Sequence, residues 1–456
     1  MIALATGIQA APEGAPLALH PDNPHYLLFR GKPTVLVTGT EHYGAVLNQD
    51  FDYTRYLDEV ARCGLNLTRT FSGAYMEHSA AFGIAGNTLA PKPGRLICPW
   101  ARSGEDGYAG GGAKFDLHRW DDAYFERLRD FCTKASERGI VVEYVLFCPF
   151  YGDEQWGLSP MNSANNVNGI GNAGREEVYA LRHTDLQALQ EALVRKAVRE
   201  LAEFDNVYYE ICNEPYFGGV TEEWQRRIAD VIAEAEQRVG VRHLIAKNIA
   251  NGSAEVTDPP PAVSILNFHY ATPPDAAAAN WDLKLAIADD ETGFRGTDDK
   301  TYRSEAWHFM LAGGAIFDHL DYSFSPGYED GTFEYPRSQP GGGSRALREQ
   351  FAILKRLIES CDFIHMAPDS DIVAGPLPAG ASWQALSKPG DEYLIYVEGG
   401  AGAQLTLALP DGAYRCEWIS TITGQRIGAP RSVGGAATLT IPDDGGDVAA
   451  KVTRRR

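Results

Sequence analysis

The chain has 456 residues, of which 44% are hydrophobic and 22% are charged, and its formal net charge is −20. This length suits one large barrel of about 250 or more residues followed by a smaller module. No apolar run reaches the ~18 residues of a membrane span, and the acidic balance disfavours phosphate binding, so we expect neither a membrane nor a nucleic-acid partner.

Two short strands are predicted near the N-terminus, at residues 25–29 and 34–38. The sequence Gly31-Lys32-Pro33 between them favours a turn, so they should pair as a hairpin under the barrel. The second strand is expected to continue into the first strand of the barrel, which would end at residues 39–43.

Helix and strand patterns alternate from residue 51 to residue 364, which is typical of a parallel sheet. Further strands are predicted at 65–71, 140–147, 206–214, 243–248, 263–270, 283–292 and 315–324. Helices are predicted at 51–63, 120–138, 186–204, 221–238, 302–312 and 344–364. We interpret the pattern as eight strand–helix units, which is the architecture of a (β/α)8 or TIM barrel.

Two long segments, residues 72–117 and 148–181, lack both periodicities. Loops of this length in a compact domain are usually functional. We expect them to narrow the cleft at the barrel mouth into a pocket.

The helical periodicity of the sequence ends at about residue 366. Short strand patterns at 383–386, 393–397, 405–409 and 414–419 alternate with Gly, Pro and Asp turns. This spacing predicts a small antiparallel β-sandwich. We therefore divide the chain into a barrel with its N-terminal hairpin, residues 1–366, and a sandwich, residues 367–456. The sandwich is expected to act as a brace, because it carries no evident cluster of exposed aromatic residues.

The seven cysteines are scattered, and none forms a Cys-x-x-Cys pair, so a thiolate zinc site is not indicated. Several lie in apolar runs, as small buried residues do, and this suits a reducing compartment. The first sixteen residues have no basic start and only a weak apolar stretch. These features favour a cytoplasmic location over secretion, but a secreted chain trimmed of its signal would have the same start.

The fourth predicted strand ends in the tripeptide Asn213-Glu214-Pro215. Pro215 donates no backbone hydrogen bond and keeps the preceding residue extended, so Glu214 should lie at the C-terminal tip of the strand. Chemistry takes place at that face of a barrel. Asn213 beside it is suited to hydrogen-bond a substrate hydroxyl.

This tripeptide resembles the acid/base motif of the clan A retaining glycoside hydrolases, the cellulase-like barrel enzymes. In that clan a second carboxylate, the nucleophile, stands at the end of strand seven. Here strand seven ends in Asp289-Asp290-Glu291, and Glu291 matches best. By alternation Asp289 would share its inward orientation and is the alternative nucleophile, whereas Asp290 should point outward. As general acid, Glu214 would need a raised pKa.

The resemblance also assigns roles at other strand ends. Arg69 on strand two corresponds to an arginine near the nucleophile, whose charge would keep Glu291 ionised. His269 and Tyr270 end strand six, where the clan often places a pair that hydrogen-bonds the nucleophile or the sugar. Which of these two adjacent side chains faces the cleft stays open.

Other candidates rest on position. His42 ends strand one, and His319 shares its orientation with Asp321 on strand eight; either histidine could bind substrate or simply pack. Glu210 would be buried inside the barrel and needs a partner such as Arg69 or Lys247. Aromatic side chains near the mouth that suit the C–H faces of a sugar are Tyr75, Trp100, Tyr151, Trp156, Tyr216, Phe217 and Tyr328.

We therefore expect a retaining glycosidase that cleaves a β-type bond of a carbohydrate substrate, without metal or organic cofactor, and that acts from a chain end or on short glycans. A transglycosylase would use the same residues. A non-catalytic sugar-binding barrel would lack one carboxylate, and a metal-dependent hydrolase would need converging histidine ligands. The sugar, the linkage and the oligomeric state are left open.

Overall fold

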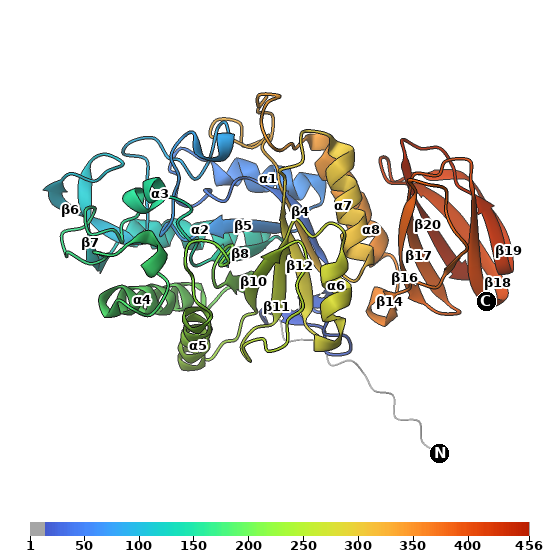
Figure 1. The fold of residues 1–456 in the computed structure, drawn as a ribbon, viewed down its shortest axis with the longest axis horizontal. Coiled ribbons are helices and arrows are strands. Elements are labelled where there is room, and N and C mark those ends of the chain that lie inside the picture. Colours follow the sequence, from blue (N-terminus) through green and yellow to red (C-terminus); the bar gives the residue numbers. More distant parts are fainter. Residues whose placement is uncertain (1–13, 456) are drawn as a thin grey trace, which may run out of the picture.

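Eight parallel strands form a barrel in the computed structural model, which describes residues 14–455 (Figure 1). Their order is β4-β13-β12-β11-β10-β9-β8-β5, and each neighbouring pair is parallel. The strands are β4 (Leu36–Thr40), β5 (Leu67–Phe71), β8 (Val141–Val145), β9 (Val207–Glu210), β10 (Ile245–Asn251), β11 (Ile265–His269), β12 (Ala286–Thr292) and β13 (Ile316–Leu320). The predicted TIM-barrel fold is confirmed.

Side chains close the barrel between its first two strands in sequence, β4 and β5. Thr38 Oγ1 donates to the carbonyl of Leu67 at 2.8 Å, and Asn66 Oδ1 accepts from the amide of Val37 at 3.1 Å. β4 and β5 are not paired as neighbours in the sheet, so backbone groups between them need other partners. These two side-chain bonds supply part of them. Polar side chains thereby join β4 to the N-terminal end of β5, at the end of the barrel away from the mouth.

The helices that follow the strands are α1 (Tyr53–Cys63), α2 (Asp122–Glu137), α3 (Asp153–Leu158), α4 (Thr184–Leu201), α5 (Glu222–Val239), α6 (Asp275–Asn280), α7 (Asp299–Leu311) and α8 (Arg345–Glu359). The expectation of eight strand–helix units is wrong at one place, since residues 252–264 after β10 contain no helix. Pro259, Pro260 and Pro261 lie in this segment. Three consecutive residues without a backbone N–H disfavour a helix there.

The N-terminal segment forms a three-stranded sheet. β2 (Leu27–Phe29) pairs with β3 (Lys32–Thr34) and with β1 (Ala18–Leu19). The second strand predicted at residues 34–38 is divided between β3 and β4. The long segment after β5 is not wholly irregular, because β6 (Trp100–Asp106) and β7 (Ala113–Trp120) form a hairpin within it. Gly111 and Gly112, both with positive φ, lie in the turn of that hairpin.

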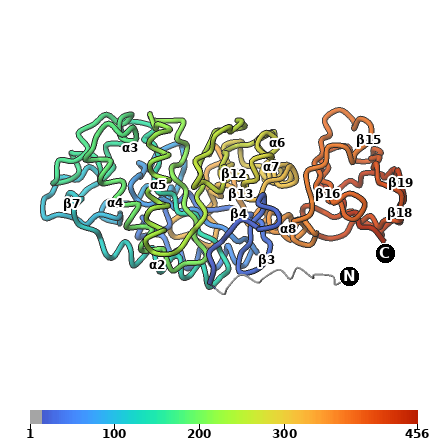
Figure 2. Tube along the Cα trace, turned by 90° about the horizontal axis from the view of Figure 1, so that it is seen from below, coloured from blue at the N-terminus to red at the C-terminus, as the bar shows by residue number. Residues whose placement is uncertain are grey.

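The C-terminal domain is an antiparallel β-sandwich, as predicted, and lies at one end of the molecule beside α7 and α8 (Figures 1 and 2). Its strands are β14 (Ala367–Pro368), β15 (Val373–Ala374), β16 (Ser382–Lys388), β17 (Glu392–Glu398), β18 (Gln404–Ser420), β19 (Arg426–Thr440) and β20 (Asp447–Arg454). The ring of Tyr396 stacks on Trp307 of α7, with centroids 5.3 Å apart. Arg303 of α7 binds Asp447 through two hydrogen bonds of 3.0 and 2.5 Å.

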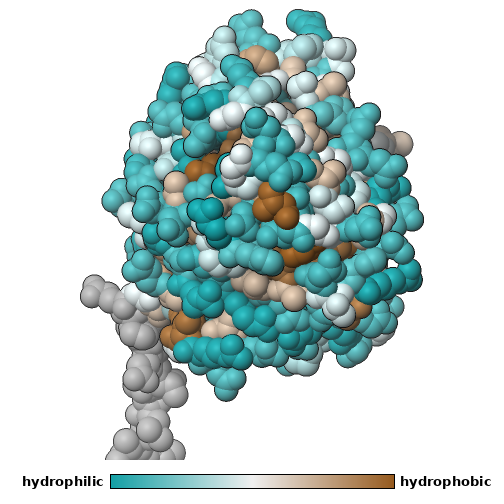
Figure 3. All heavy atoms as spheres, turned by 90° about the vertical axis from the view of Figure 1, so that its left-hand side faces the viewer, coloured by the Kyte–Doolittle hydropathy of each residue, from teal (hydrophilic) through white to brown (hydrophobic). Residues whose placement is uncertain are grey.

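The far end of the barrel, around β6, β7 and α4, presents a mostly hydrophilic surface with only isolated hydrophobic spots (Figure 3). None of the described helices is long and apolar enough to cross a membrane. All seven cysteines lie within residues 14–455, where each is buried and unpaired.

Candidate active site

A pocket of about 540 Å³ opens at the C-terminal ends of the barrel strands. This is the face that carries the active sites of barrel enzymes, and the volume is typical of small-ligand sites. Its lining comes from the C-terminal ends of seven strands and from the segments that follow them: His42, Tyr43, Phe71, Tyr75, Glu77, Phe82, Leu89, Cys148, Tyr151, Asn213, Glu214, Phe217, Asn251, Tyr270, Glu291, Phe294 and Arg295.

Glu214 projects into this pocket from the segment after β9. Its Oε2 accepts a hydrogen bond of 2.6 Å from the hydroxyl of Tyr151, and its Oε1 accepts one of 3.2 Å from Tyr216. The side chain is 9% exposed, so ligand can reach it while bulk water is largely excluded. Asn213 beside it accepts from Arg69 and donates to Tyr151, each bond measuring 2.8 to 2.9 Å.

Glu291 on β12 faces Glu214 across the pocket floor. Its Oε2 accepts from the hydroxyl of Tyr43 at 3.0 Å and from Arg69 Nη1 at 3.3 Å, and its Oε1 accepts from the hydroxyl of Tyr270. Three donors to one carboxylate fix its orientation. Such a carboxylate is suited to act as a nucleophile.

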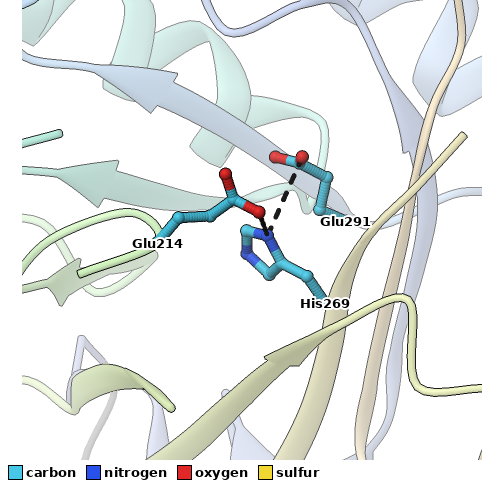
Figure 4. Close-up of side chains that lie close together, drawn as sticks. All are labelled: Glu214, His269 and Glu291. Carbon is cyan, nitrogen blue, oxygen red and sulfur yellow. Dashed lines mark hydrogen bonds and ion pairs between the residues drawn. The ribbon is translucent and has the colours of Figure 1, made fainter. Parts of the chain in front are cut away.

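His269 lies between the two carboxylates (Figure 4). Its Nδ1 is 3.3 Å from Oε1 of Glu214 and 3.8 Å from Oε1 of Glu291. One oxygen of Glu214, one of Glu291 and a ring nitrogen of His269 all lie within 4.8 Å of one another. The open question about strand six is answered by the geometry: Tyr270 lines the pocket and His269 lies beneath it, and both reach the carboxylates.

The surroundings of His269 favour its charged form. Burial alone would lower its pKa, but Glu291, Asp290 and Glu214 raise the pKa well above the ordinary value of 6.5. Asn248 also meets Nε2, and its Oδ1 is otherwise unpartnered among the described residues. An amide turned so that Oδ1 accepts would give Nε2–H a partner, in agreement with the raised pKa of His269.

The pKa of Glu214 differs from the sequence-based expectation. Burial acts to raise it, but the hydrogen bond and the charge of His269 act more strongly, with further help from Tyr151 and Tyr216, and lower the pKa below its ordinary value. These opposite shifts favour a proton on His269 over one on Glu214. The two groups are one hydrogen bond apart.

Three residues of the site have backbone conformations that are unusual for residues other than glycine. Glu214, Tyr43 and Tyr270 have φ values of 36°, 61° and 52°. Left-handed backbone at such residues costs energy and persists where the surrounding structure imposes it, often at functional sites. Each residue follows a barrel strand, and the sharp turn aims its side chain back over the barrel mouth.

A buried layer of charge supports the site from below. Arg69 is fully buried and donates to Glu210 at 2.5 Å, while its Nε lies 3.5 Å from Glu143 and 3.8 Å from Asp290. Arg69 is thus the partner that Glu210 required; Lys247 instead pairs with Glu222 near the surface. Burial and the charge of Asp290 raise the pKa of Glu143 well above its ordinary value.

Replacing Arg69 by methionine should destabilise the fold strongly. The substitution leaves several carboxylates buried without their cation, and breaking a buried pair in this way costs about 3–5 kcal/mol. Arg226→Met is the matched control, because Arg226 is 35% exposed where it pairs with Glu222, and its loss should cost less than about 1 kcal/mol. Urea unfolding measures both, and equal losses would contradict the role assigned to Arg69.

The orientations predicted for the acidic residues before Glu291 are wrong. Asp290 points into the barrel, 3.1 Å from His269, whereas Asp289 accepts from the backbone of Ala271. The register between β12 and β13 shifts between Asp289 and Thr292. This bulge adds one residue and reverses the alternation on which the prediction depended. Asp289 is therefore no longer an alternative nucleophile.

His42 lines the pocket together with Glu77, a carboxylate that the sequence did not single out. His42 Nε2 lies 3.2 Å from Oε2 of Glu77, which also accepts from Asn87 at 2.6 Å and, through Oε1, from Tyr75 at 3.0 Å. Burial opposes both charges, but their mutual contact lowers the pKa of Glu77 and raises that of His42. His42 and Glu77 therefore form an ion pair at the pocket wall.

Two residues expected to bind substrate lie outside the pocket. Trp156 is buried in the segment after β8, where its Nε1 donates to the carbonyl of Ala173 at 2.9 Å. His319 is fully buried, 3.1 Å from Thr292 Oγ1, and its ring packs on Tyr302. Burial lowers the pKa of His319 to about 4, so it is a neutral core residue.

Two sets of three side chains in the described part of the chain have potential metal-ligand atoms within 4.8 Å of one another: Glu214, His269 and Glu291, and Glu143, Glu210 and Asp290. Arg69 contacts a member of each set, Glu291 at 3.3 Å and Glu210 at 2.5 Å. A guanidinium that cannot lose its proton already balances these carboxylates and repels a second cation. The two sets of side chains are therefore better suited to bind protons and the Arg69 guanidinium than a divalent metal ion.

The charge on His269 has a measurable consequence for stability. A folded pKa above the unfolded value of 6.5 gives stability that is complete below pH 6.5 and is lost as the pH rises through the folded value. Relative to His269→Gln, the wild-type free energy of unfolding should therefore fall as the pH rises above 6.5. Urea unfolding of both proteins from about pH 6 to about pH 9 tests this, and a difference independent of pH would contradict a charged His269.

Comparisons with known proteins agree with this fold. A family profile described as a domain of unknown function, DUF6298, matches residues 93–258, and no curated protein has a significantly similar sequence. A solved structure of a putative glycoside hydrolase from Bacteroides vulgatus is 14% identical, with a TM-score of 0.70, over 97% of this chain and 83% of the other.

Two further solved structures are glycoside hydrolases of family 5. One, also from Bacteroides vulgatus, is 15% identical, with a TM-score of 0.65, over 97% of this chain and 94% of the other. The second, a mannosidase from Rhizomucor miehei, is 10% identical, with a TM-score of 0.53, over 77% of this chain and all of the other. At these identities the comparisons establish that the chain shares the fold of these enzymes.

Proposed function

We propose that the protein is a retaining glycoside hydrolase that cleaves a β-glycosidic bond by double displacement. One observation carries the proposal: oxygens of Glu214 and Glu291 lie within 4.8 Å of each other at the floor of the pocket. Retaining enzymes separate their carboxyl groups by about 5–5.5 Å, whereas inverting enzymes need about 6.5–9.5 Å to admit a water. The glycoside hydrolases that share this fold support the same reaction class.

Each carboxylate has the surroundings that its role requires. Glu291, held by Arg69, attacks the anomeric carbon and forms a covalent glycosyl-enzyme. Glu214 gives its proton to the departing glycosidic oxygen and then takes a proton from the water that releases the sugar. His269, 3.3 Å from Glu214, can supply the proton for the first step, since a bound sugar that excludes water makes an ionised Glu214 less favourable.

The pocket wall favours a short glycan or the end of a longer one. Tyr75, Glu77, Phe82 and Leu89 all come from the long segment between β5 and β6, and they form one side of the pocket. Aromatic faces there suit the C–H faces of a pyranose, and the pair of Glu77 and His42 suits its hydroxyls. A wall on this side restricts how far a chain can continue past the reacting sugar.

A panel of aryl β-glycosides tests this proposal. We expect at least one to be hydrolysed, and NMR should show the β-anomer as the first product, because two displacements restore the configuration. Addition of a sugar acceptor would reveal transglycosylation as a transfer product. A chelator should leave the rate unchanged. An α-anomer as first product, or no reaction with any member of the panel, would overturn the proposal.

A further inference from the structure

A second cavity, of about 420 Å³, lies beside the pocket at the junction of the two domains. One wall comes from Thr272 and Pro274, which follow β11, and from the face of α7 that carries Ser304 and His308. The opposite wall comes from β16 and the end of β17 in the sandwich. Arg295, in the segment after β12, lines both this cavity and the pocket, so the two are neighbours across one side chain.

Fixed contacts hold the two walls of this cavity together. Ser304 of α7 donates to Glu398 of β17 at 2.6 Å, and His308 lies 3.3 Å from Glu398 and 3.1 Å from Ser382. The pair of Arg303 and Asp447 adds a fully buried tie between the domains. A cavity between walls that are tied in this way is already formed before a ligand binds, and this lowers the entropic cost of binding.

The lining of the cavity has the composition of a sugar site. Trp383 is only partly buried, with part of the ring packed against the sandwich core, so an apolar aromatic surface remains available. The amide of Gln384 makes no side-chain hydrogen bond to any of residues 14–455 and offers both a donor and an acceptor. Glu398, whose pKa is lowered to about 2 chiefly by its hydrogen bond with His308, adds a permanent acceptor.

We propose that this cavity is a second carbohydrate site, in which the sandwich and the barrel together bind the part of the glycan that extends beyond the reacting sugar. Its ligand class rests on the proposed function, since the same substrate occupies both sites. Arg295 stands between the two and can donate to hydroxyls on either side. The sandwich thereby does more than brace the barrel, and it makes affinity depend on the length of the glycan.

Binding measurements on the whole protein test this inference without relying on turnover. Calorimetric titrations use β-linked gluco-, manno-, xylo- and galacto-oligosaccharides, from the monosaccharide upward. The variants are Trp383→Ala, Trp383→Phe and Gln384→Ala, with Ile422→Ala as control, because Ile422 is exposed on the sandwich and does not line the cavity. Thermal unfolding shows whether Trp383→Ala is folded. If it is not, Gln384→Ala still tests the cavity.

Among the oligosaccharide series that bind, the affinity of the wild-type protein should increase with the number of sugar units. Trp383→Ala should lower the affinity for the longer members about tenfold, as expected for loss of an aromatic contact, and leave the monosaccharide unchanged. Trp383→Phe should lose less, Gln384→Ala should weaken the longer members only, and Ile422→Ala should match the wild type.

The outcomes separate this inference from the proposed function. Binding that depends on length through Trp383 or Gln384, without turnover of any glycoside, would overturn the proposed function and leave the second site standing. If the protein hydrolyses a glycoside, but substitution of Trp383 or Gln384 does not change how affinity depends on glycan length, the second site alone would be overturned. Absence of binding by every oligosaccharide in the series would also overturn it.

Discussion

Glu291→Ala should lower the turnover of an activated aryl glycoside by about 10⁵-fold, the effect expected when a covalent nucleophile is removed. Release of the aryl group measures this loss. The fold should persist, because Glu291 stands at the end of β12 and not in the apolar core. Glu291→Gln preserves the shape of the side chain and serves as the folding control, with thermal unfolding as the readout.

Azide distinguishes a lost nucleophile from a disturbed site. In Glu291→Ala the space left by the carboxylate can admit this small anion, which attacks the anomeric carbon from the same face. We expect partial recovery of the rate and a glycosyl azide of inverted, α configuration. A residual rate that azide does not change, in a variant with a normal unfolding transition, would contradict the role of Glu291.

Glu214→Ala should separate substrates by their leaving groups. Without the acid, a glycoside whose leaving group needs a proton should lose about 10²–10⁴-fold in rate, the range that general acid catalysis contributes. An aryl glycoside with a strongly acidic phenol needs no proton for bond cleavage and should lose far less in that step. A series of phenols of graded pKa measures the difference as a slope.

Glu77→Gln is the matched control for this series. Glu77 is a second carboxylate of the pocket, also nearly buried, but it binds His42 and Asn87 rather than facing Glu291. Its loss should weaken binding of all the glycosides alike and leave the slope unchanged. If Glu214→Ala also lowers every substrate by the same factor, the acid role is wrong.

The sequence allowed prediction of the elements whose position depends on local pattern. The alternation of strands and helices implied the barrel, with Glu214 on its C-terminal face. The proline after Glu214 was expected to keep that residue extended at a strand tip, and this is wrong, because β9 ends at Glu210 and Glu214 follows with a left-handed φ of 36°. Arg69, Glu214 and Glu291 could be expected to meet because parallel strands end at one face of the barrel. In the structure Arg69 donates directly to Glu291 and to Asn213, which precedes Glu214 in the chain.

The features that sequence reasoning missed depend on tertiary detail. The bulge in β12 that turns Asp290 inward adds one residue to an otherwise regular alternation, and no local residue type announces it. Glu77 belongs to a segment without periodicity, so its contact with His42 depends on the path of that segment. Trp156 and His319 have the chemistry of sugar-binding residues, but burial removes them from the pocket.

The central claim, that Glu291 becomes covalently bound to the sugar, can be tested by trapping the intermediate. The reagent is a 2-deoxy-2-fluoro glycosyl fluoride of the sugar that the aryl-glycoside panel identifies. Fluoride is a good leaving group, so the covalent glycosyl-enzyme should form. Fluorine at C2 destabilises both transition states, so hydrolysis of that intermediate should be slow and the intermediate should accumulate. Intact-protein mass spectrometry should then show one added fluoroglycosyl unit, and peptide mapping should place it on Glu291. A label on another residue, or complete turnover of the aryl glycoside by an enzyme that never carries the label, would contradict the account.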